Sequence, residues 1–117
     1  MGLTREMSVL DIGCGLGGAA RFCAIEYGSI LSGIDLTLEF IETGKTLTSW
    51  LKMDDLISLK QGSALELPLE DSSFDAAYMM HVGMNIPDKA KLCRETARVL
   101  KKGCLLYTSD AADEWCG

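Results

Sequence analysis

The sequence predicts a three-layer α/β fold with a mainly parallel sheet. Short apolar runs alternate along the chain with amphipathic segments of ten or more residues, and a glycine-rich turn directly follows the first apolar run. Strands that alternate with helices of this length are joined by right-handed crossovers, so they lie parallel in one sheet. The chain has 117 residues, of which 48% are hydrophobic. That amount of apolar material suits the core of one domain.

The first two strands and the helix between them are predicted from the first 35 residues. Ser8 to Ile12 (SVLDI) is a short apolar run broken by one acid, which is typical of a buried strand. Small and apolar residues then recur at helical spacing from Gly18 to Tyr27, and Gly28 follows where a helix-ending glycine is expected. Residues 29–35 form the next predicted strand.

A second helix and a third strand follow. Thr37 is a suitable N-cap for this helix, and Glu39 lies in its first turn. We expect the large apolar residues to form its buried face; they are Leu36, Phe40, Leu47, Trp50 and Leu51. Residues 56–61 then read as the third strand.

A fourth strand and a third helix complete the predicted elements. Residues 74–80 (FDAAYMM) are almost continuously apolar, which is typical of a strand covered on both faces, so Tyr78, Met79 and Met80 are expected in the core. Pro87 suits the first turn of the helix that follows. The helical spacing places Ala90, Cys93, Ala97 and Leu100 inward and Lys91, Arg94, Arg98 and Lys101 in water.

Composition excludes several classes of function. A net charge of −6 leaves no surplus of Lys and Arg to replace the counterions of a nucleic acid, so small neutral or cationic ligands are favoured instead. No apolar run approaches the ~20 residues of a membrane span, and no basic leader follows Met1, so a soluble cytoplasmic location is predicted. Five cysteines without CxxC spacing and a single histidine indicate neither a disulfide framework nor a metal site.

The glycine-rich turn is the strongest candidate for ligand contact. In open α/β sheets the ligand lies at the carboxyl ends of the strands, where the first strand-to-helix turn lines the crevice. Gly13, Gly15 and Gly18 satisfy the dinucleotide pattern GxGxxG. However, Asp11 precedes them and gives D-x-G-x-G-x-G with Gly17. Because a carboxylate repels a pyrophosphate, Asp11 favours a cationic or amine-bearing ligand, unless it only caps neighbouring amides.

Asp35 is the second acidic candidate. It ends the second predicted strand 22 residues after Gly13, at the position from which a carboxylate accepts hydrogen bonds from the hydroxyls of an adenosine ribose. The alternative is a solvated strand end without function. The position of Asp35 relative to the glycine turn favours the first interpretation. For the glycines themselves, four in six residues exceed what one turn requires, which favours contact with a ligand.

Four ordered motifs resemble the class I S-adenosylmethionine-dependent methyltransferases. They are VLDIGCGLGG (9–18), GID (33–35), QGSALELPLEDSSFD (61–75) and ETARVLKKG (95–103). Together they cover residues 8–103, and the chain is most similar to small-molecule enzymes of the sarcosine, dimethylglycine, tocopherol and ubiquinone-biosynthesis type. The resemblance implies a Rossmann-like α-β-α sandwich, S-adenosyl-L-methionine as cofactor and methyl transfer to a small-molecule acceptor.

The resemblance also implies roles for individual residues. Gly13, Gly15 and Gly17 would let the backbone approach the methionine and ribose parts of the cofactor, with Asp11 near the methionine end and Asp35 on the ribose hydroxyls.

Adenine binding departs from the family pattern. The acid that commonly accepts from the adenine amine is replaced by Ser63, followed by Ala64, and Leu36 and Leu65 are candidate walls, with ordinary core packing as the alternative for both leucines.

The acceptor side is less defined. His81 follows the fourth strand and is the candidate general base or substrate-orienting group, the alternative being a loop histidine that bonds to backbone. Asn85 is a candidate for the acceptor pocket. Methyl transfer is an in-line displacement, and alignment with exclusion of water contributes roughly 7 to 11 kcal/mol, so a catalytic side chain is dispensable.

The carboxyl-terminal stretch departs from the family. Residues 104–114 (CLLYTSDAADE) match the translation of a transposon-end adapter used in sequencing libraries, so we expect 1–103 to be a partial methyltransferase domain and 104–117 a non-native tail. The fold would then be truncated to four native strands, with the apolar start of the tail in the place of a fifth. Two other interpretations stay open: an NAD- or FAD-binding module of an oxidoreductase, and a fragment without turnover.

Overall fold

The computed structural model of the protein describes residues 7–79 and 88–108. They form an alternating series of strands and helices: β1 Ser8–Ile12, α1 Gly18–Tyr27, β2 Ile30–Asp35, α2 Leu38–Trp50, β3 Ile57–Gln61, β4 Phe74–Met79, α3 Lys89–Val99 and β5 Leu100–Thr108. The predicted elements are therefore confirmed, with shifts of one residue at the start of β2 and β3. The prediction that Pro87 lies in the first turn of the third helix is wrong, because α3 begins at Lys89 and its N-cap is Asp88. Met80, the last residue of the predicted fourth strand, and Pro87 lie outside the described residues.

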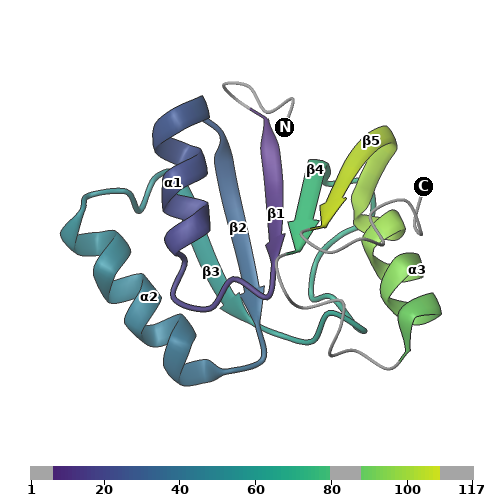
Figure 1. Cartoon of the computed structure of the whole chain (residues 1–117), viewed down its shortest axis with the longest axis horizontal. Coiled ribbons are helices and arrows are strands. Elements are labelled where there is room, and N and C mark those ends of the chain that lie inside the picture. The colour runs from purple at the N-terminus through teal and green to yellow at the C-terminus, as the bar shows by residue number, and fades with distance from the viewer. Residues whose placement is uncertain (1–6, 80–87, 109–117) are drawn as a thin grey trace.

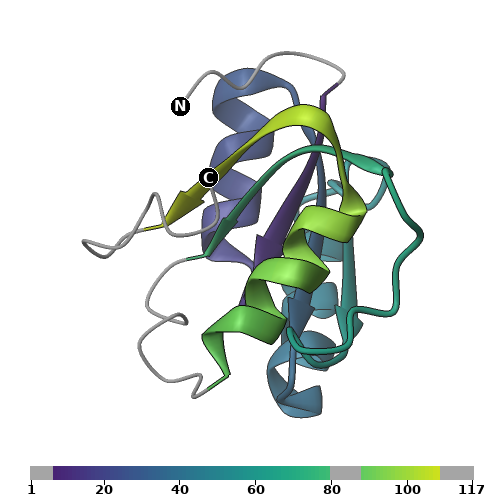
Figure 2. The same ribbon diagram turned by 90° about the vertical axis from the view of Figure 1, so that its right-hand side faces the viewer.

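The sheet has the strand order β3-β2-β1-β4-β5, and every neighbouring pair is parallel. Figure 1 shows β1 at its centre, with α1 and α2 on one side of the molecule and α3 on the other. Successive side chains of β1 enter opposite layers: Val9 packs toward α1 and α2, and Leu10 packs toward α3. The three-layer arrangement is thus confirmed, and the view in Figure 2 shows α1 and α3 on opposite faces of the sheet.

The strand order reverses at the boundary between the neighbouring strands β1 and β4. β2 and β3 are added on one side of β1, and β4 and β5 on the other. Because all strands are parallel, their carboxyl ends meet at one edge of the sheet. This arrangement creates the switch point at which ligands of open α/β sheets bind.

The predicted buried face of α2 is wrong. Leu36, Phe40, Trp50 and Leu51 are exposed and Leu47 is half-buried, whereas the buried residues are Ile41, Gly44 and Thr48. The cause is a close approach at Gly44. A Cβ there would lie 2.7 Å from the Leu16 carbonyl oxygen and 2.8 Å from Leu59 Cδ1. The helix therefore contacts the sheet through its smallest residue, which a search for large apolar residues misses.

The predicted faces of α3 also need correction. Ala90 and Ala97 are exposed and Cys93 is half-buried, whereas Leu92, Thr96 and Val99 are buried at the spacing i, i+4, i+7. Thr96 is tolerated inside because its hydroxyl donates to the Leu92 carbonyl at 2.8 Å. Arg98, predicted to face water, is half-buried. Leu100, the fourth residue predicted to face inward, is half-buried in β5 rather than part of α3.

β5 crosses the boundary expected after residue 103. Its ladder with β4 pairs Phe74 with Leu100 and then Ala76 with Leu105, so the register shifts between these two pairs. A strand here agrees with the expectation that the apolar start of the tail would occupy the fifth position.

The described residues include two free cysteines and one that is cross-linked. Cys14 and Cys23 are free, but Cys93 is disulfide-bonded, so the expectation of no cross-link is wrong at one position. No cluster of three potential metal ligands occurs in the described part of the chain. None of its helices is long and apolar enough to cross a membrane.

Candidate functional site

The glycine turn after β1 is fixed by its own backbone. The N–H groups of Gly13 and Cys14 both donate to the Ile34 carbonyl, at 2.7 and 3.0 Å. Gly17 N–H donates to the Cys14 carbonyl at 2.9 Å, which closes the turn before α1. Gly13, Gly15 and Gly17 have φ values of 78°, 56° and 85°, in the left-handed region that favours glycine. The shape of the turn itself therefore favours glycine at these three positions, so the expectation that the turn needs fewer glycines is wrong for all but Gly18.

Two of the glycines have different surroundings. A Cβ on Gly15 would meet no atom within 4 Å, so the space beside its backbone is open. A Cβ on Gly17 would lie 3.0 Å from Arg21 Nη1 and 3.3 Å from Leu59 Cδ1. Gly17 is also the N-cap of α1. Its lack of a side chain is explained by packing and backbone shape, whereas Gly15 is the glycine beside which a ligand has room.

The Asp35 carboxylate bridges the turn after β1 and the turn after β2. One oxygen, Oδ2, accepts from Gly15 N–H at 2.9 Å, and the other, Oδ1, accepts from Thr37 N–H at 2.9 Å. The side chain is half-buried at the carboxyl end of β2. A carboxylate has about four lone-pair sites, so these two bonds leave acceptor capacity for donors from a ligand.

Asp11 lies beneath the turn and is almost fully buried, with 2% of its surface exposed. Its Oδ2 accepts from the Tyr78 hydroxyl at 2.8 Å. Burial raises the pKa of Asp11 to about 7; the bond from Tyr78 opposes this rise, and the charge of Asp35 adds to it. Tyr78 is in the core as predicted, but its bond to Asp11 was not predicted, because the two residues are 67 positions apart in the sequence.

The two free thiols near the turn are not candidates for nucleophilic catalysis. Burial raises the pKa of Cys14 to about 12, and the charges of Asp11 and Asp35 add to the rise. Burial also raises the pKa of Cys23. Since the thiolate is the reactive form, both side chains stay neutral and unreactive near pH 7.

The turn after β3 lies next to Asp35. Gly62 N–H donates to the Asp35 carbonyl at 3.0 Å. The Ser63 hydroxyl accepts from Leu65 N–H at 3.1 Å, which leaves it able to make further hydrogen bonds. Ser63, Ala64 and Leu65 are all half-buried. The predicted base-binding residues therefore lie beside the predicted ribose-binding residue.

Other predicted positions have different outcomes. Leu36 has 69% of its surface exposed and its carbonyl accepts from Gln61 Nε2 at 3.1 Å. This exposure excludes the alternative that Leu36 belongs to the core. Its predicted role as a wall beside the ligand stays a prediction. His81 and Asn85 lie outside the described residues, so their predicted roles remain predictions.

The arrangement can hold a ligand that donates hydrogen bonds to carboxylates. Asp35 offers free acceptor sites next to the open side of Gly15, and Asp11 adds a buried carboxyl group below. Neither carboxyl group forms an ion pair within residues 7–79 and 88–101. These features fit a nucleoside with two ribose hydroxyls and a cationic or amine-bearing extension.

A separate hollow lies on the outer edge of the sheet. It has a volume of about 650 Å³ and is lined by residues of α2, β3 and the loop between them, among them Ile41, Lys45 and Lys60. None of the predicted cofactor-binding residues lines it. The hollow is therefore distinct from the site at the glycine turn.

Residues 10–108 match the family described as "Methyltransferase domain". The chain belongs to this family. Its relatives include the probable tocopherol O-methyltransferase of rice, with 40% identity over 96% of the chain and 30% of the rice protein. The glycine/sarcosine/dimethylglycine N-methyltransferase of Actinopolyspora halophila is 31% identical over 96% of the chain and 20% of that protein.

Solved methyltransferase structures have the same architecture. A putative sarcosine dimethylglycine methyltransferase from Galdieria sulphuraria superposes with a TM-score of 0.88 and 32% identity, over 90% of this chain and 39% of that protein. Geranyl diphosphate C-methyltransferase from Streptomyces coelicolor, solved with S-adenosyl-L-homocysteine, gives 0.86 and 25%, over 92% and 40%. The chain thus spans well under half the length of these relatives.

Proposed function

We propose that the chain is the cofactor-binding part of an S-adenosylmethionine-dependent methyltransferase that acts on a small-molecule acceptor. The carrying observation is the Asp35 carboxylate, held by Gly15 and Thr37 with acceptor sites to spare beside an open backbone. Family membership supports the proposal, as do relatives whose names describe methylation of tocopherol, sarcosine and geranyl diphosphate. When bound, the cofactor supplies a methyl group on a sulfonium.

The residues at the turn would bind and orient the cofactor. Asp35 accepts from the ribose hydroxyls, and the backbone of Gly13 and Gly15 comes close to the ribose and methionine parts. Gly17 keeps the turn in shape for this approach. Asp11, beneath the turn, contributes charge near the methionine amine, and a nearby ammonium group favours its ionised form.

The remaining predicted residues complete the proposal. Ser63 and Ala64 contact the base, with Leu36 and Leu65 beside it. His81 is proposed as the general base or orienting group for the acceptor. With the reactants aligned and water excluded, no side chain of the chain needs to form a covalent bond to the acceptor.

Calorimetric titration of the whole chain tests the cofactor. S-adenosylhomocysteine is expected to bind, and NADH is not, because the Asp11 carboxylate disfavours a pyrophosphate. Binding of NADH alone would establish the oxidoreductase alternative. A methyl-transfer assay on the same protein tests the other alternative, in which the chain is a fragment that binds S-adenosylmethionine weakly or not at all and has no turnover.

Substitution of Asp35 tests the carrying observation. Asp35→Ala is expected to weaken S-adenosylhomocysteine binding by roughly 1.5 to 3 kcal/mol, since hydrogen bonds to a charged acceptor are lost. Asp35→Asn keeps an acceptor oxygen and is expected to lose less. Asp55→Ala, an exposed acid after α2, is the matched control and should bind as the wild type does. Unchanged affinity in a folded Asp35→Ala variant would refute the role.

A further inference from the structure

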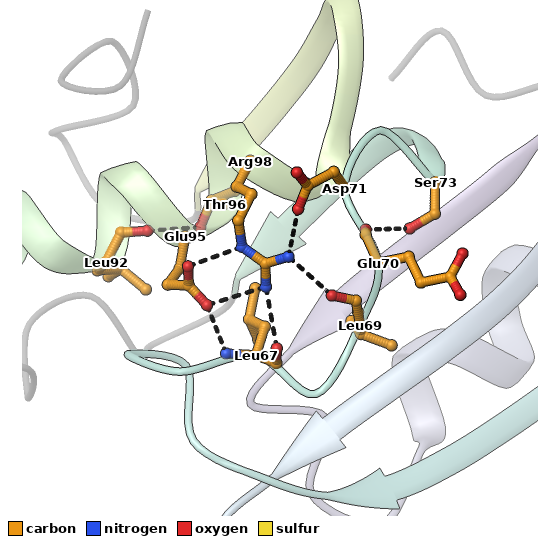
Figure 3. A network of polar contacts seen from close by, with 9 residues as sticks. All are labelled: Leu67, Leu69, Glu70, Asp71, Ser73, Leu92, Glu95, Thr96 and Arg98. Carbon is orange, nitrogen blue, oxygen red and sulfur yellow. Dashed lines mark hydrogen bonds and ion pairs between the residues drawn. The ribbon is translucent and has the colours of Figure 1, made fainter.

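Arg98 connects α3 to the segment between β3 and β4. Its guanidinium donates five hydrogen bonds, as Figure 3 shows. Nε and Nη2 bind the two carboxylate oxygens of Glu95 at 2.8 and 3.0 Å. Nη1 donates to the Leu69 carbonyl at 2.8 Å and to Asp71 Oδ1 at 2.7 Å, and Nη2 donates to the Leu67 carbonyl at 3.0 Å. One side chain thus binds three positions along the segment.

Glu95 and the end of α3 add further bonds to the same segment. Glu95 Oε1 accepts from Leu67 N–H at 2.7 Å, and the bond from Arg98 holds the pKa of Glu95 below its usual range. The backbone N–H groups of Ser72 and Ser73 donate to the carbonyls of Arg98 and Val99, both at 2.8 Å. Residues 67–73 are therefore fixed to α3 at both ends.

The fixed stretch continues directly into the turn beside Asp35. Between β3 and β4 the only regular pairing in the described structure is a single bridge from Ser63 to Glu66. Pro68 packs against Gly62, where an added Cβ would lie 2.9 Å from Pro68 Cδ. Leu67, which Arg98 and Glu95 hold by its two backbone groups, immediately follows this turn. Residues 63–66 have one backbone bond of their own, from Glu66 N–H to the Ser63 carbonyl at 3.2 Å, and the side chains of α3 fix the residue that follows them.

We propose that Arg98 and Glu95 are positioning residues that hold the Ser63–Glu66 turn against the base of the bound nucleoside. The inference rests on the proposed function, in which the ribose binds Asp35. A base attached to that ribose lies beside the next strand outward, β3, and the turn begins there with the bond from Gly62 to the Asp35 carbonyl. The turn offers the Ser63 hydroxyl and backbone groups, which are directional and require accurate placement.

The affinity test compares two arginines of one helix. Arg98→Ala is expected to weaken S-adenosylhomocysteine binding about tenfold, and Arg98→Lys by less, because lysine keeps the charge without the planar fork. Arg94→Ala is the matched control: Arg94 is exposed and forms no hydrogen bond or ion pair within the described residues. Equal affinities of the wild type and Arg98→Ala would overturn the proposal.

A second readout separates positioning from general loss of stability. S-inosylhomocysteine carries a carbonyl oxygen in place of the adenine amine, so the ratio of its Kd to that of S-adenosylhomocysteine reports how well the turn reads the base. This ratio is expected to fall toward one in Arg98→Ala and to stay unchanged in Arg94→Ala. If Arg98→Ala weakens both ligands equally and keeps the ratio, Arg98 has only a structural role.

A double-mutant cycle tests whether Arg98 acts through the turn. As a single substitution, Ser63→Ala should weaken S-adenosylhomocysteine binding about threefold. Added to Arg98→Ala, it should weaken binding no further. Additive effects would contradict the coupling.

NMR spectra of the ligand-free variants give a further check: core resonances show that a variant is folded, and the Leu67 amide resonance reports whether the start of the fixed stretch has moved. The Leu67 resonance is expected to move in Arg98→Ala while core resonances persist; an unmoved Leu67 resonance also counts against the proposal. Failure of the wild type itself to bind S-adenosylhomocysteine would refute the proposed function instead.

Discussion

Acidic side chains lack a cationic partner in one region of the described structure and are paired with an arginine in another. At the glycine turn, Asp11 and Asp35 accept hydrogen bonds from a tyrosine and from backbone amides, and neither forms an ion pair with the described residues. Between α3 and the segment before β4, Glu95 and Asp71 both bind the guanidinium of Arg98. Burial raises the pKa of Asp11, whereas Arg98 lowers that of Glu95.

The difference separates the carboxylates of the proposed binding site from carboxylates that serve the fold. A buried acid without a cation costs stability, and groups of this kind cluster at functional sites. An acid paired with arginine inside the chain already has its counter-charge. Charge pairing therefore distinguishes the proposed binding site from the polar network of α3, although both are rich in carboxylates and hydrogen bonds.

The largest expected effect concerns Asp11. Its folded-state pKa is raised from 3.8 to about 7, so the native state binds the proton more tightly than the unfolded state and stability falls as the pH rises between these values. Asp11→Asn removes this loss and is expected to raise the free energy of unfolding at pH 8, by up to about 4 kcal/mol. Denaturant unfolding at pH 8 and pH 4 measures it.

The gain from Asp11→Asn should largely vanish at pH 4, because the wild-type carboxyl group is then protonated in the folded state. Tyr78→Phe removes only the hydroxyl and serves as the comparison for loss of the hydrogen bond alone. A variant that is less stable than the wild type at pH 8 would show that Asp11 is structural.

Glu95→Gln is expected to have a smaller effect of the opposite sign. Its side chain is 19% exposed and binds both Arg98 and the Leu67 amide, so the variant should lose about 1.5 to 3 kcal/mol at pH 7. Because the folded-state pKa is lowered, the wild-type advantage is present above the usual glutamate pKa and disappears as the pH falls below it. Unfolding at pH 7 and pH 3 tests both parts, and a pH-independent difference would contradict them.

Asp71→Asn should have the smallest effect. Asp71 binds Arg98 at 2.7 Å, but its side chain is 74% exposed, so solvent screens the pair. The expected loss is below about 0.5 kcal/mol and should shrink further in 1 M salt. Thermal unfolding of the two variants compares their losses of stability. Equal losses for Asp71→Asn and Glu95→Gln would show that side-chain exposure does not determine how much each acid contributes.

The sequence predicted the glycine-turn region better than the α3 region, because its signals are local. The strand at Ser8–Ile12 and the helix at Gly18–Tyr27 were located to the residue, since apolar runs and glycines mark their ends. Asp35 was predicted from its place at the end of a strand, and Gly15, whose N–H it accepts from, is only 20 positions away in the sequence.

The features that could not be predicted depend on distant partners. Arg98 bonds to residues 27 to 31 positions away in the sequence, and the helical periodicity alone predicted that it would face solvent. Likewise α2 is seated by Gly44, whose importance is visible only once Leu16 and Leu59 are placed against it. The Asp11–Tyr78 bond requires knowing that β1 and β4 are neighbours.

That neighbour relation also bears on how the chain folds. The ladder of β1 with β4 pairs Val9 with Ala76, and the bond of Tyr78 to Asp11 closes a loop of 67 residues. Contacts of such long sequence separation are the slow ones to form, since the loop entropy is lost before they contribute. During synthesis the central strand is left with one open side until β4 has emerged. The crevice between these strands is therefore among the last features to take shape.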